Sequence, residues 1–302
     1  MTELRVRRPK FDFTDDVPFI WNPQNPAFSL FMNATSMIAI CFEQMIVTAV
    51  QEAKPLMTEP AIAAEATAFL RQEAQHSSSH RKHVTALTRA YPGLQQTLDD
   101  AIADYDELGR STPLKFRLAY VADLEATFTP SFKMFLDNEA TLFAPGDDRV
   151  ASLLLWHFVE EVEHRSSALV IYDAVVGEKW YRIRALPRVV RHLLRIMAVI
   201  ADGINTHVPW DDRRVDARTL LPAYGFRHTL SRKLAAAPPG EAGPAFAAVP
   251  RPQLLHTAAG VLLSQTPYHN PEHQQLPAFA DQWFDRWDRG GDVAHWYTAS
   301  AH

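Results

Sequence analysis

Residues 153 to 164 read Leu-Leu-Leu-Trp-His-Phe-Val-Glu-Glu-Val-Glu-His, an apolar run followed by side chains that can bind a metal ion. His157, Glu161 and His164 are spaced by four and three residues, and residues at these spacings share one face of an α-helix. Glu161 and His164 also form a Glu-x-x-His pair, whose two side chains can reach the same ion. The stretch therefore predicts a buried helix that carries metal ligands.

The same pattern occurs a second time, earlier in the chain. Glu73 and His76 form another Glu-x-x-His pair, and a lone glutamate precedes each pair, Glu43 before the first and Glu125 before the second. A four-helix bundle that holds two metal ions in its core needs this order of ligands. Four carboxylates and two imidazoles without a thiolate suit Fe or Mn better than structural zinc.

A structural interpretation of these glutamates competes with the metal-binding one. Glu43 and Glu125 lie in segments that otherwise predict a protein core, and a buried carboxylate must be paired, protonated or metal-bound. A lone buried glutamate is more often salt-bridged than metal-bound, and a single Glu-x-x-His pair arises freely on a solvated helix face. The complete order, repeated twice, is much harder to obtain by chance and favours metal binding.

Composition predicts an all-α protein. The chain has 302 residues, of which 47% are hydrophobic, and this is ample for a sizeable core. Only 11 residues are glycine, and long runs rich in Ala, Leu, Glu and Arg favour helices over a large sheet. We expect a four-helix bundle at residues 27–177, with an N-terminal arm at residues 1–26 and additional C-terminal helices at residues 178–302, all in one domain.

Helix boundaries follow from proline and glycine. A first helix is expected at about 27–53, before Lys54-Pro55, and a second from Glu59-Pro60 to about residue 90. A shorter connecting helix is expected at about 94–109, and the helix that carries Glu125 begins at Pro113. A last bundle helix is expected to run without interruption from about residue 148 to Gly177.

Charge and cysteine usage exclude several classes of protein. A net charge of -5 argues against general nucleic-acid binding. Cys41 is the single cysteine, so a reducing cytoplasm is the simpler setting. We expect no secretory signal, and no window reaches the uninterrupted apolar length that a membrane span requires.

The segment at 180–199 is basic and amphipathic, and includes Arg188, Arg191 and Arg195. A solvated face that covers the bundle is the favoured interpretation. An anionic substrate group, such as a phosphate of coenzyme A, or a membrane surface or partner are the alternatives. The later stretch His269-Asn270-Pro271-Glu272-His273 predicts a turn, because it contains Pro and Asn. A second metal site there is the weaker interpretation, because the ligand spacing matches none of the usual patterns.

The ligand order resembles that of the ferritin-like non-heme di-iron carboxylate proteins. Within them, His157-x-x-x-Glu161-x-x-His164 is similar to the arylamine N-oxygenases, where the additional histidine is a further protein ligand. With Trp21-Asn22-Pro23 and Tyr268-His269-Asn270-Pro271, the whole chain resembles a bacterial family labelled "predicted metal-dependent hydrolase". Some members of that family are di-iron monooxygenases of natural-product pathways that hydroxylate terpenoid acyl-CoA substrates.

The resemblance implies a set of metal ligands, namely Glu43, Glu73, His76, Glu125, His157, Glu161 and His164. His80 lies on the same stripe as His76 and is a candidate ligand, a hydrogen-bond partner behind a ligand, or a surface residue. We favour one of the last two roles. Tyr120, Asp123 and Asp173 are weaker candidates for partners behind the ligands.

The function that the resemblance implies is oxygen activation. Two Fe ions, with Mn/Fe left open, would use dioxygen to hydroxylate or N-oxygenate a small molecule, such as a terpenoid acyl-CoA. The electrons would come from a separate ferredoxin or flavin reductase, because the sequence has no Rossmann glycine pattern and no cysteine cluster. A dinuclear hydrolase and an iron-storage protein are the alternatives, and both a monomer and a homodimer fit the sequence.

Overall fold

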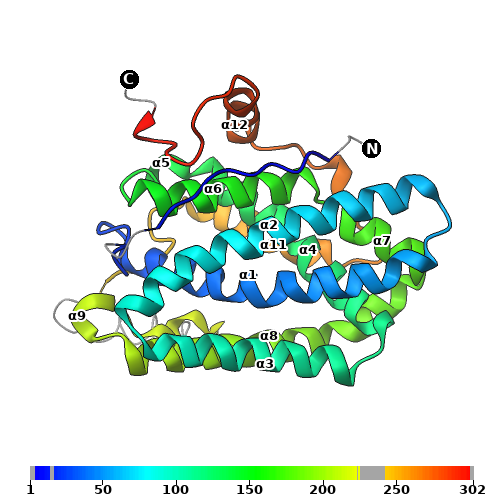
Figure 1. Cartoon of the computed structure of the whole chain (residues 1–302), viewed down its shortest axis with the longest axis horizontal. Helices are drawn as coiled ribbons and strands as arrows, with labels where there is room; N and C mark the ends of the chain where they lie inside the picture. The colour runs from blue at the N-terminus through cyan, green and yellow to red at the C-terminus, as the bar shows by residue number, and fades with distance from the viewer. Residues whose placement is uncertain (1–3, 14–16, 223, 225–241, 300–302) are drawn as a thin grey trace.

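The computed structural model describes residues 4–13, 17–222, 224 and 242–299, and every regular element among them is a helix (Figure 1). Helices from four segments surround the predicted ligands and form the bundle: α1 (Pro26–Ala53), α2 (Pro60–Ala90), α4 (Leu114–Asp137) and α6 (Asp148–Glu163). The all-α prediction is confirmed, and the observed bounds of α1 and α2 agree with the expected ones to within a residue or two.

Further helices pack around the bundle. α3 (Gly93–Ser111) and α8 (Lys179–His207) lie side by side against α1 and α4 (Figure 1). α11 (Arg251–Ser264) packs on α4, and α12 (Ala278–Asp288) contacts α4 and α6. The shorter helical elements are η1 (Lys54–Leu56), α5 (Glu139–Leu142), α7 (Ser167–Val175), α9 (Trp210–Arg213), η2 (Ala217–Leu220) and η3 (Pro271–His273).

Local sequence explains where the bundle helices begin. The Asn25 side chain accepts a hydrogen bond from the Phe28 N–H at the start of α1, and Pro26 occupies the first turn. Asp147 accepts from the Arg149 N–H at the start of α6. Gly146, just before it, is required because a Cβ there would lie 2.5 Å from the Trp21 ring.

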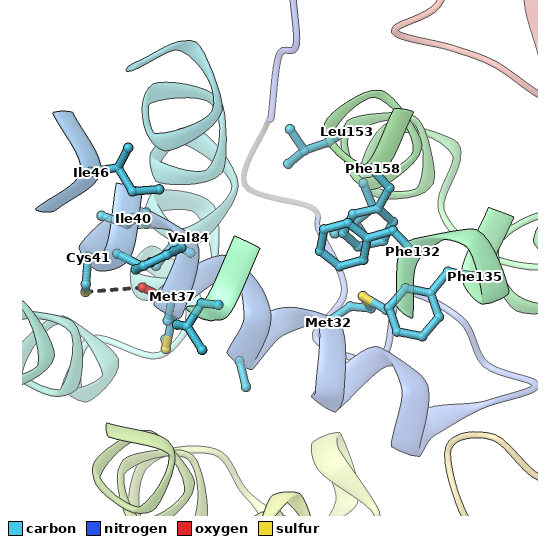
Figure 2. Close-up of a cluster of buried hydrophobic side chains, with 14 of the residues drawn as sticks. Met32, Met37, Ile40, Cys41, Ile46, Val84, Phe132, Phe135, Leu153 and Phe158 are labelled. Carbon is cyan, nitrogen blue, oxygen red and sulfur yellow. Dashed lines mark hydrogen bonds between the residues drawn. The ribbon is translucent and has the colours of Figure 1, made fainter. Parts of the chain in front are cut away.

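The bundle is closed by aromatic packing beside the predicted site (Figure 2). The rings of Phe132 on α4 and Phe158 on α6 are stacked with centroids 4.2 Å apart. Phe135 and Met32 extend this cluster toward α1, and all four side chains are buried. Such packing holds α4 and α6 at a fixed separation, which a shared metal site between them needs.

The last bundle helix differs from the prediction because it is interrupted. α6 ends at Glu163 and α7 begins at Ser167, whereas we expected one continuous helix to Gly177. The Arg165 guanidinium donates to the Val162 carbonyl over 2.8 Å, and the Ser167 N–H donates to the His164 carbonyl over 2.8 Å. These bonds satisfy carbonyl groups that a broken helix would otherwise leave unpaired. His164 therefore sits at the end of a helix.

The expectation that no segment could span a membrane was too strong. The stretch Pro26–Leu56 is long and apolar enough by composition, with a mean hydropathy of 1.5. However, 72% of the 18-residue apolar window within this stretch is buried inside the structure, as in the core helix of a soluble bundle. One such helix is weak evidence for a span.

The N-terminal arm lies along α2 and α6 (Figure 1). Lys82 and Arg89 of α2 donate hydrogen bonds to the carbonyls of Phe11 and Phe13. The Phe11 ring packs on Trp156 of α6, with centroids 5.3 Å apart. The arm is therefore anchored to the two helices that carry most of the predicted ligands.

Candidate metal centre

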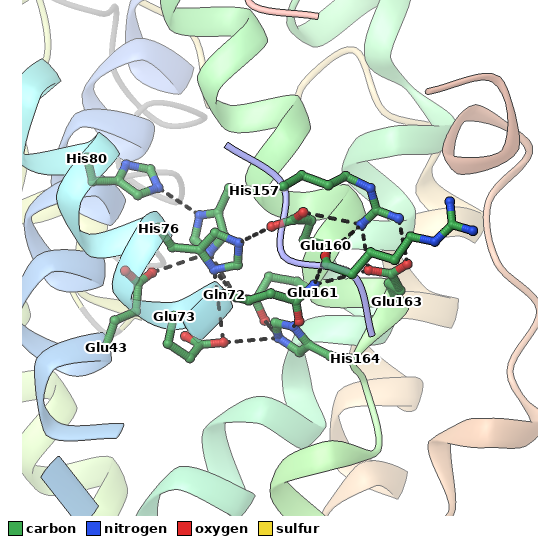
Figure 3. Close-up of polar contacts among 12 residues, drawn as sticks. Glu43, Gln72, Glu73, His76, His80, His157, Glu160, Glu161, Glu163 and His164 are labelled. Carbon is green, nitrogen blue, oxygen red and sulfur yellow. Dashed lines mark hydrogen bonds and ion pairs between the residues drawn. The ribbon is translucent and has the colours of Figure 1, made fainter. Parts of the chain in front are cut away.

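The bundle brings the predicted ligand side chains together in its interior (Figure 3). Six of the seven form two groups, within each of which the donor atoms lie within 4.8 Å of one another, and all six are buried. The first group consists of Glu43, His76, His157 and Glu161, and the second of Glu73, Glu161 and His164. Glu161 belongs to both groups.

Glu161 connects the groups through its two carboxylate oxygens. Its Oε1 lies 2.9 Å from His157 Nε2 and 3.4 Å from His76 Nδ1. Its Oε2 lies 3.0 Å from His164 Nε2. A carboxylate with one oxygen in each group has the geometry of a bridge between two ions.

The other three predicted glutamates differ in their relation to these groups, since Glu43 and Glu73 are members and Glu125 belongs to neither. Glu43 Oε1 lies 3.3 Å from His157 Nε2. Glu73 Oε1 lies 3.2 Å from His164 Nε2 and 4.0 Å from His76 Nδ1, between the two groups. Glu125 Oε2 lies 3.7 Å from His164 Nε2, so this glutamate belongs near the second group.

The donor atoms fit a metal pair because several of them lack another partner. Among the described residues, four of these side chains have buried polar atoms without a hydrogen bond: Glu43 Oε2, both carboxylate oxygens of Glu73, His76 Nδ1 and Glu125 Oε1. Buried polar groups without partners are rare and costly in folded proteins. Cations between the two groups would satisfy them together.

Burial dominates the protonation of the carboxylates in the metal-free protein. Desolvation, reinforced by the charge of Glu161, raises the pKa of Glu73 and Glu125 well above the ordinary value. Desolvation likewise raises the pKa of Glu43. Burial also acts on Glu161, but the charge of His164 and hydrogen bonds from the surrounding imidazoles hold its pKa well below the ordinary value. The shared carboxylate therefore stays ionised while its neighbours retain protons.

His80 lies behind His157 and is fully buried. His80 Nε2 is 2.7 Å from His157 Nδ1, and His80 Nδ1 is 3.0 Å from Ser36 Oγ. Burial lowers the pKa of His157 to about 4 and holds the pKa of His80 well below its ordinary value, so both rings are neutral. If His157 Nε2 binds a metal, its Nδ1–H donates to His80, whose own Nδ1–H donates to Ser36.

The hydrogen bonds from His157 to His80 and from His80 to Ser36 lead to a testable prediction. A His80→Phe variant should bind Co²⁺ about ten- to a hundredfold more weakly, because phenylalanine cannot accept the His157 proton. His80→Gln, whose amide oxygen can accept it, should recover part of the affinity. Titration with Co²⁺ measures the affinity of both variants. The control is His256→Phe, at an exposed position of α11. Equal affinity of the Phe variant and the wild type would contradict the proposed orientation of His157.

Sequence reasoning missed the polar partners behind the other two histidines. Glu160 Oε2 lies 3.0 Å from His76 Nε2, and Gln72 Oε1 lies 3.1 Å from His164 Nδ1. Both missed side chains are fully buried. Each directly precedes a predicted ligand glutamate. For Glu160 the available signal was an acidic residue in a helix buried on nearly all sides, whereas Gln72 lies on the partly exposed α2 and had no such signal.

The weaker candidates lie elsewhere. Tyr120 Oη is hydrogen-bonded to Tyr105 and to His192, not to a predicted ligand. Asp123 pairs with Arg182 over 3.3 Å. Asp173 is exposed, so the suggestion that it supports a ligand is wrong.

The basic segment forms α8, and the three arginines predicted as anionic-substrate contacts lie on its exposed face, whereas Arg182 of the same helix is buried. Arg188 stacks over the Phe116 ring at 4.4 Å, and Arg195 pairs with Asp104. Arg191 is exposed as well. None of these contacts reaches the predicted ligands.

The late His269 loop is not among the metal-competent groups of the described residues. Its expected turn is present as η3, and the side chain of His273 lies outside the described part of the chain. Arg165 donates to the Pro271 carbonyl over 3.0 Å, which ties the loop to the break between α6 and α7.

The fold and the site define an all-helical protein with a buried cluster of glutamates and histidines that could bind metal. A family model described as "predicted metal-dependent hydrolase" matches residues 5–237, and the chain belongs to this family. No curated protein and no solved structure matches the chain.

Proposed function

We propose that this protein is a dinuclear metal enzyme whose two ions are held between α1, α2, α4 and α6. The observation that carries the proposal is the position of Glu161, which offers one oxygen to each group of ligands. The unpartnered donor atoms of Glu73 and Glu125 support it independently. The ions would be two Fe, or one Mn and one Fe, because the donors are carboxylates and imidazoles.

We propose oxygen activation as the reaction that the donor set supports best. A redox-active metal pair would supply electrons to dioxygen for oxygenation of a small molecule. The chain's own residues would orient the ions and exclude water. Phe69 and Trp156 serve the second purpose, since their rings lie 4.9 Å from those of His164 and His76, respectively.

The proposed partners follow from the same chemistry. The substrate would be a small organic molecule, with an acyl-CoA as one candidate class, and the electrons would come from a ferredoxin or a flavin reductase. The single cysteine, Cys41, is buried, so the chain cannot supply a cysteine-ligated iron–sulfur cluster of its own. A cytoplasmic location agrees with these partners and is part of the proposal.

Hydrolysis is the second candidate, and the family description favours it over oxygenation. Two ions can activate water and stabilise a leaving oxygen without any change in oxidation state. The same residues would hold the ions, and the shared Glu161 would have the same role. The two candidates differ in whether the reaction needs a reductant and dioxygen.

One experiment separates the two reactions. Protein expressed with iron is analysed for metal content, reduced without oxygen, and then exposed to oxygen while its visible absorption and oxygen consumption are recorded. About two irons per chain and a transient band would support oxygenation. Zinc-supported cleavage of ester substrates without reductant, and no response to oxygen, would support hydrolysis. Absence of bound metal under all loading conditions would overturn the dinuclear proposal.

A further inference from the structure

Behind the two Glu-x-x-His histidines lies a buried polar network that no prediction included. Arg7 of the N-terminal arm lies at its centre, although it is more than 150 positions from Glu160 and Glu163 in the sequence. Its Nη1 donates to Glu160 Oε1 over 3.2 Å and to Glu163 Oε2 over 2.7 Å, and its Nη2 donates to Glu163 Oε1 over 2.9 Å. Only 5% of Arg7 is exposed.

One branch of the network leads to His76. Glu160, which Arg7 contacts through Oε1, presents its other oxygen to His76 Nε2 at 3.0 Å. The opposite ring nitrogen, His76 Nδ1, faces Glu161 and Glu73 inside the site. A carboxylate that accepts from Nε2–H leaves the lone pair of Nδ1 free for a metal ion and fixes the plane of the ring.

The other branch leads to His164. Gln72 Nε2 donates to Glu163 Oε2 over 3.1 Å and to the Arg5 carbonyl over 3.1 Å. Its Oε1 must therefore be the acceptor for His164 Nδ1–H, at 3.1 Å. This leaves the lone pair of His164 Nε2 directed at the second group of donors.

Arg7 can bind the carboxylates of both branches, Glu160 and Glu163, at once because its guanidinium is planar, always charged and carries several N–H donors. It keeps the Glu163 carboxylate in a two-point ion pair, and Glu163 in turn fixes the amide of Gln72. Phe284 of α12 covers the other side of Arg7, with the guanidinium carbon 4.5 Å from its ring centroid. The arm and the C-terminal helix thus enclose the network.

We propose that Arg7 is a positioning residue of the metal centre, which orients His76 and His164, one imidazole in each group, through Glu160 and the Glu163–Gln72 pair. The inference rests on the dinuclear centre proposed above. It makes the N-terminal arm part of the metal site, although the arm supplies no ligand. Loss of Arg7 would leave the buried Glu160 and the partly buried Glu163 without their cation, and both carboxylates could then turn away from their partners.

The test compares Arg7→Met with Arg5→Met. Arg5 has an exposed side chain paired with Asp288, and its backbone carbonyl, which Gln72 uses, is retained in the variant. Co²⁺ binding to the full chain is measured by titration against a competing chelator, with thermal unfolding of the metal-free proteins recorded in parallel. We expect Arg7→Met to weaken Co²⁺ binding about ten- to a hundredfold, and Arg5→Met to leave it within about twofold of the wild type.

A double-mutant cycle separates positioning from general stability. Arg7→Met and Glu160→Gln should weaken Co²⁺ binding less in combination than the sum of their separate effects, because both act through His76. Arg7→Lys should recover part of the affinity, since lysine keeps the charge but not the two-point contact. A loss of metal-free stability with unchanged Co²⁺ affinity in Arg7→Met would overturn the inference. If the wild type binds no Co²⁺, the dinuclear proposal itself fails.

Discussion

Glu161→Ala is expected to abolish binding of both ions, and activity should fall by more than the roughly hundredfold that follows loss of a residue behind a ligand. The reason is that, among the residues that the structure describes, Glu161 alone contributes to both donor groups, through Oε1 to one and Oε2 to the other. Burial opposes ionisation of Glu161, but the charge of His164 and hydrogen bonds from the imidazoles hold its pKa well below the ordinary value, so this carboxylate is ionised. Elemental analysis of the purified variant measures the result.

Glu125→Ala is the matched comparison. Glu125 lies near His164 and not in the first donor group, so this variant should keep the ion held by Glu43, His76 and His157. Glu107→Ala, on the exposed surface of α3, should keep both. Circular dichroism would verify that all three variants remain helical. Two ions per chain in Glu161→Ala would disprove the bridging role.

The bundle helices could be predicted from sequence because local signals determine their ends. The prolines of Asn25-Pro26 and Glu59-Pro60 are the local signals for the starts of α1 and α2, and these helices begin at Pro26 and Pro60. The break at residues 164–166 could not be predicted, since residues 148–177 carry an unbroken helical pattern. Its stabilising contacts include Ser167 Oγ donating to Glu65 over 2.8 Å, a contact across 102 positions of sequence.

In the candidate site, too, the residues with a local sequence signal could be predicted, and those placed by tertiary packing could not. The spacing of Glu73 with His76 and of Glu161 with His164 is a helical periodicity, which sequence records directly. The twofold order of ligands predicted that the two pairs would meet, and the structure brings them together. Arg7 had no such signal, because a charged residue in an extended arm contacts Glu160 only through tertiary packing. Metal binding by these residues remains a prediction.

Removal of the metal should leave a protein whose stability falls as the pH rises from about 6.5, the unfolded pKa of histidine, toward the folded His76 value of about 10. In the metal-free chain, burial raises the pKa of Glu43, Glu73 and Glu125. Burial opposes protonation of His76, but its acidic partners Glu160 and Glu161 raise its pKa to about 10. Groups with a raised folded pKa stabilise the fold fully below their unfolded pKa and lose that contribution as the pH rises through the folded value.

Metal binding must reverse this dependence, because ligands bind in their deprotonated forms and the ions displace the retained protons. Affinity for Co²⁺ should therefore rise by up to about tenfold per pH unit for each proton released, and the stabilisation by metal should grow with pH. Thermal unfolding with and without chelator, and proton release into a weakly buffered indicator, measure the two effects. Glu125→Gln carries no titrating proton at that position and should release fewer. An affinity that is constant or falls over this pH range would mean that these carboxylates do not surrender their protons to metal, and the ligand set would have to be revised.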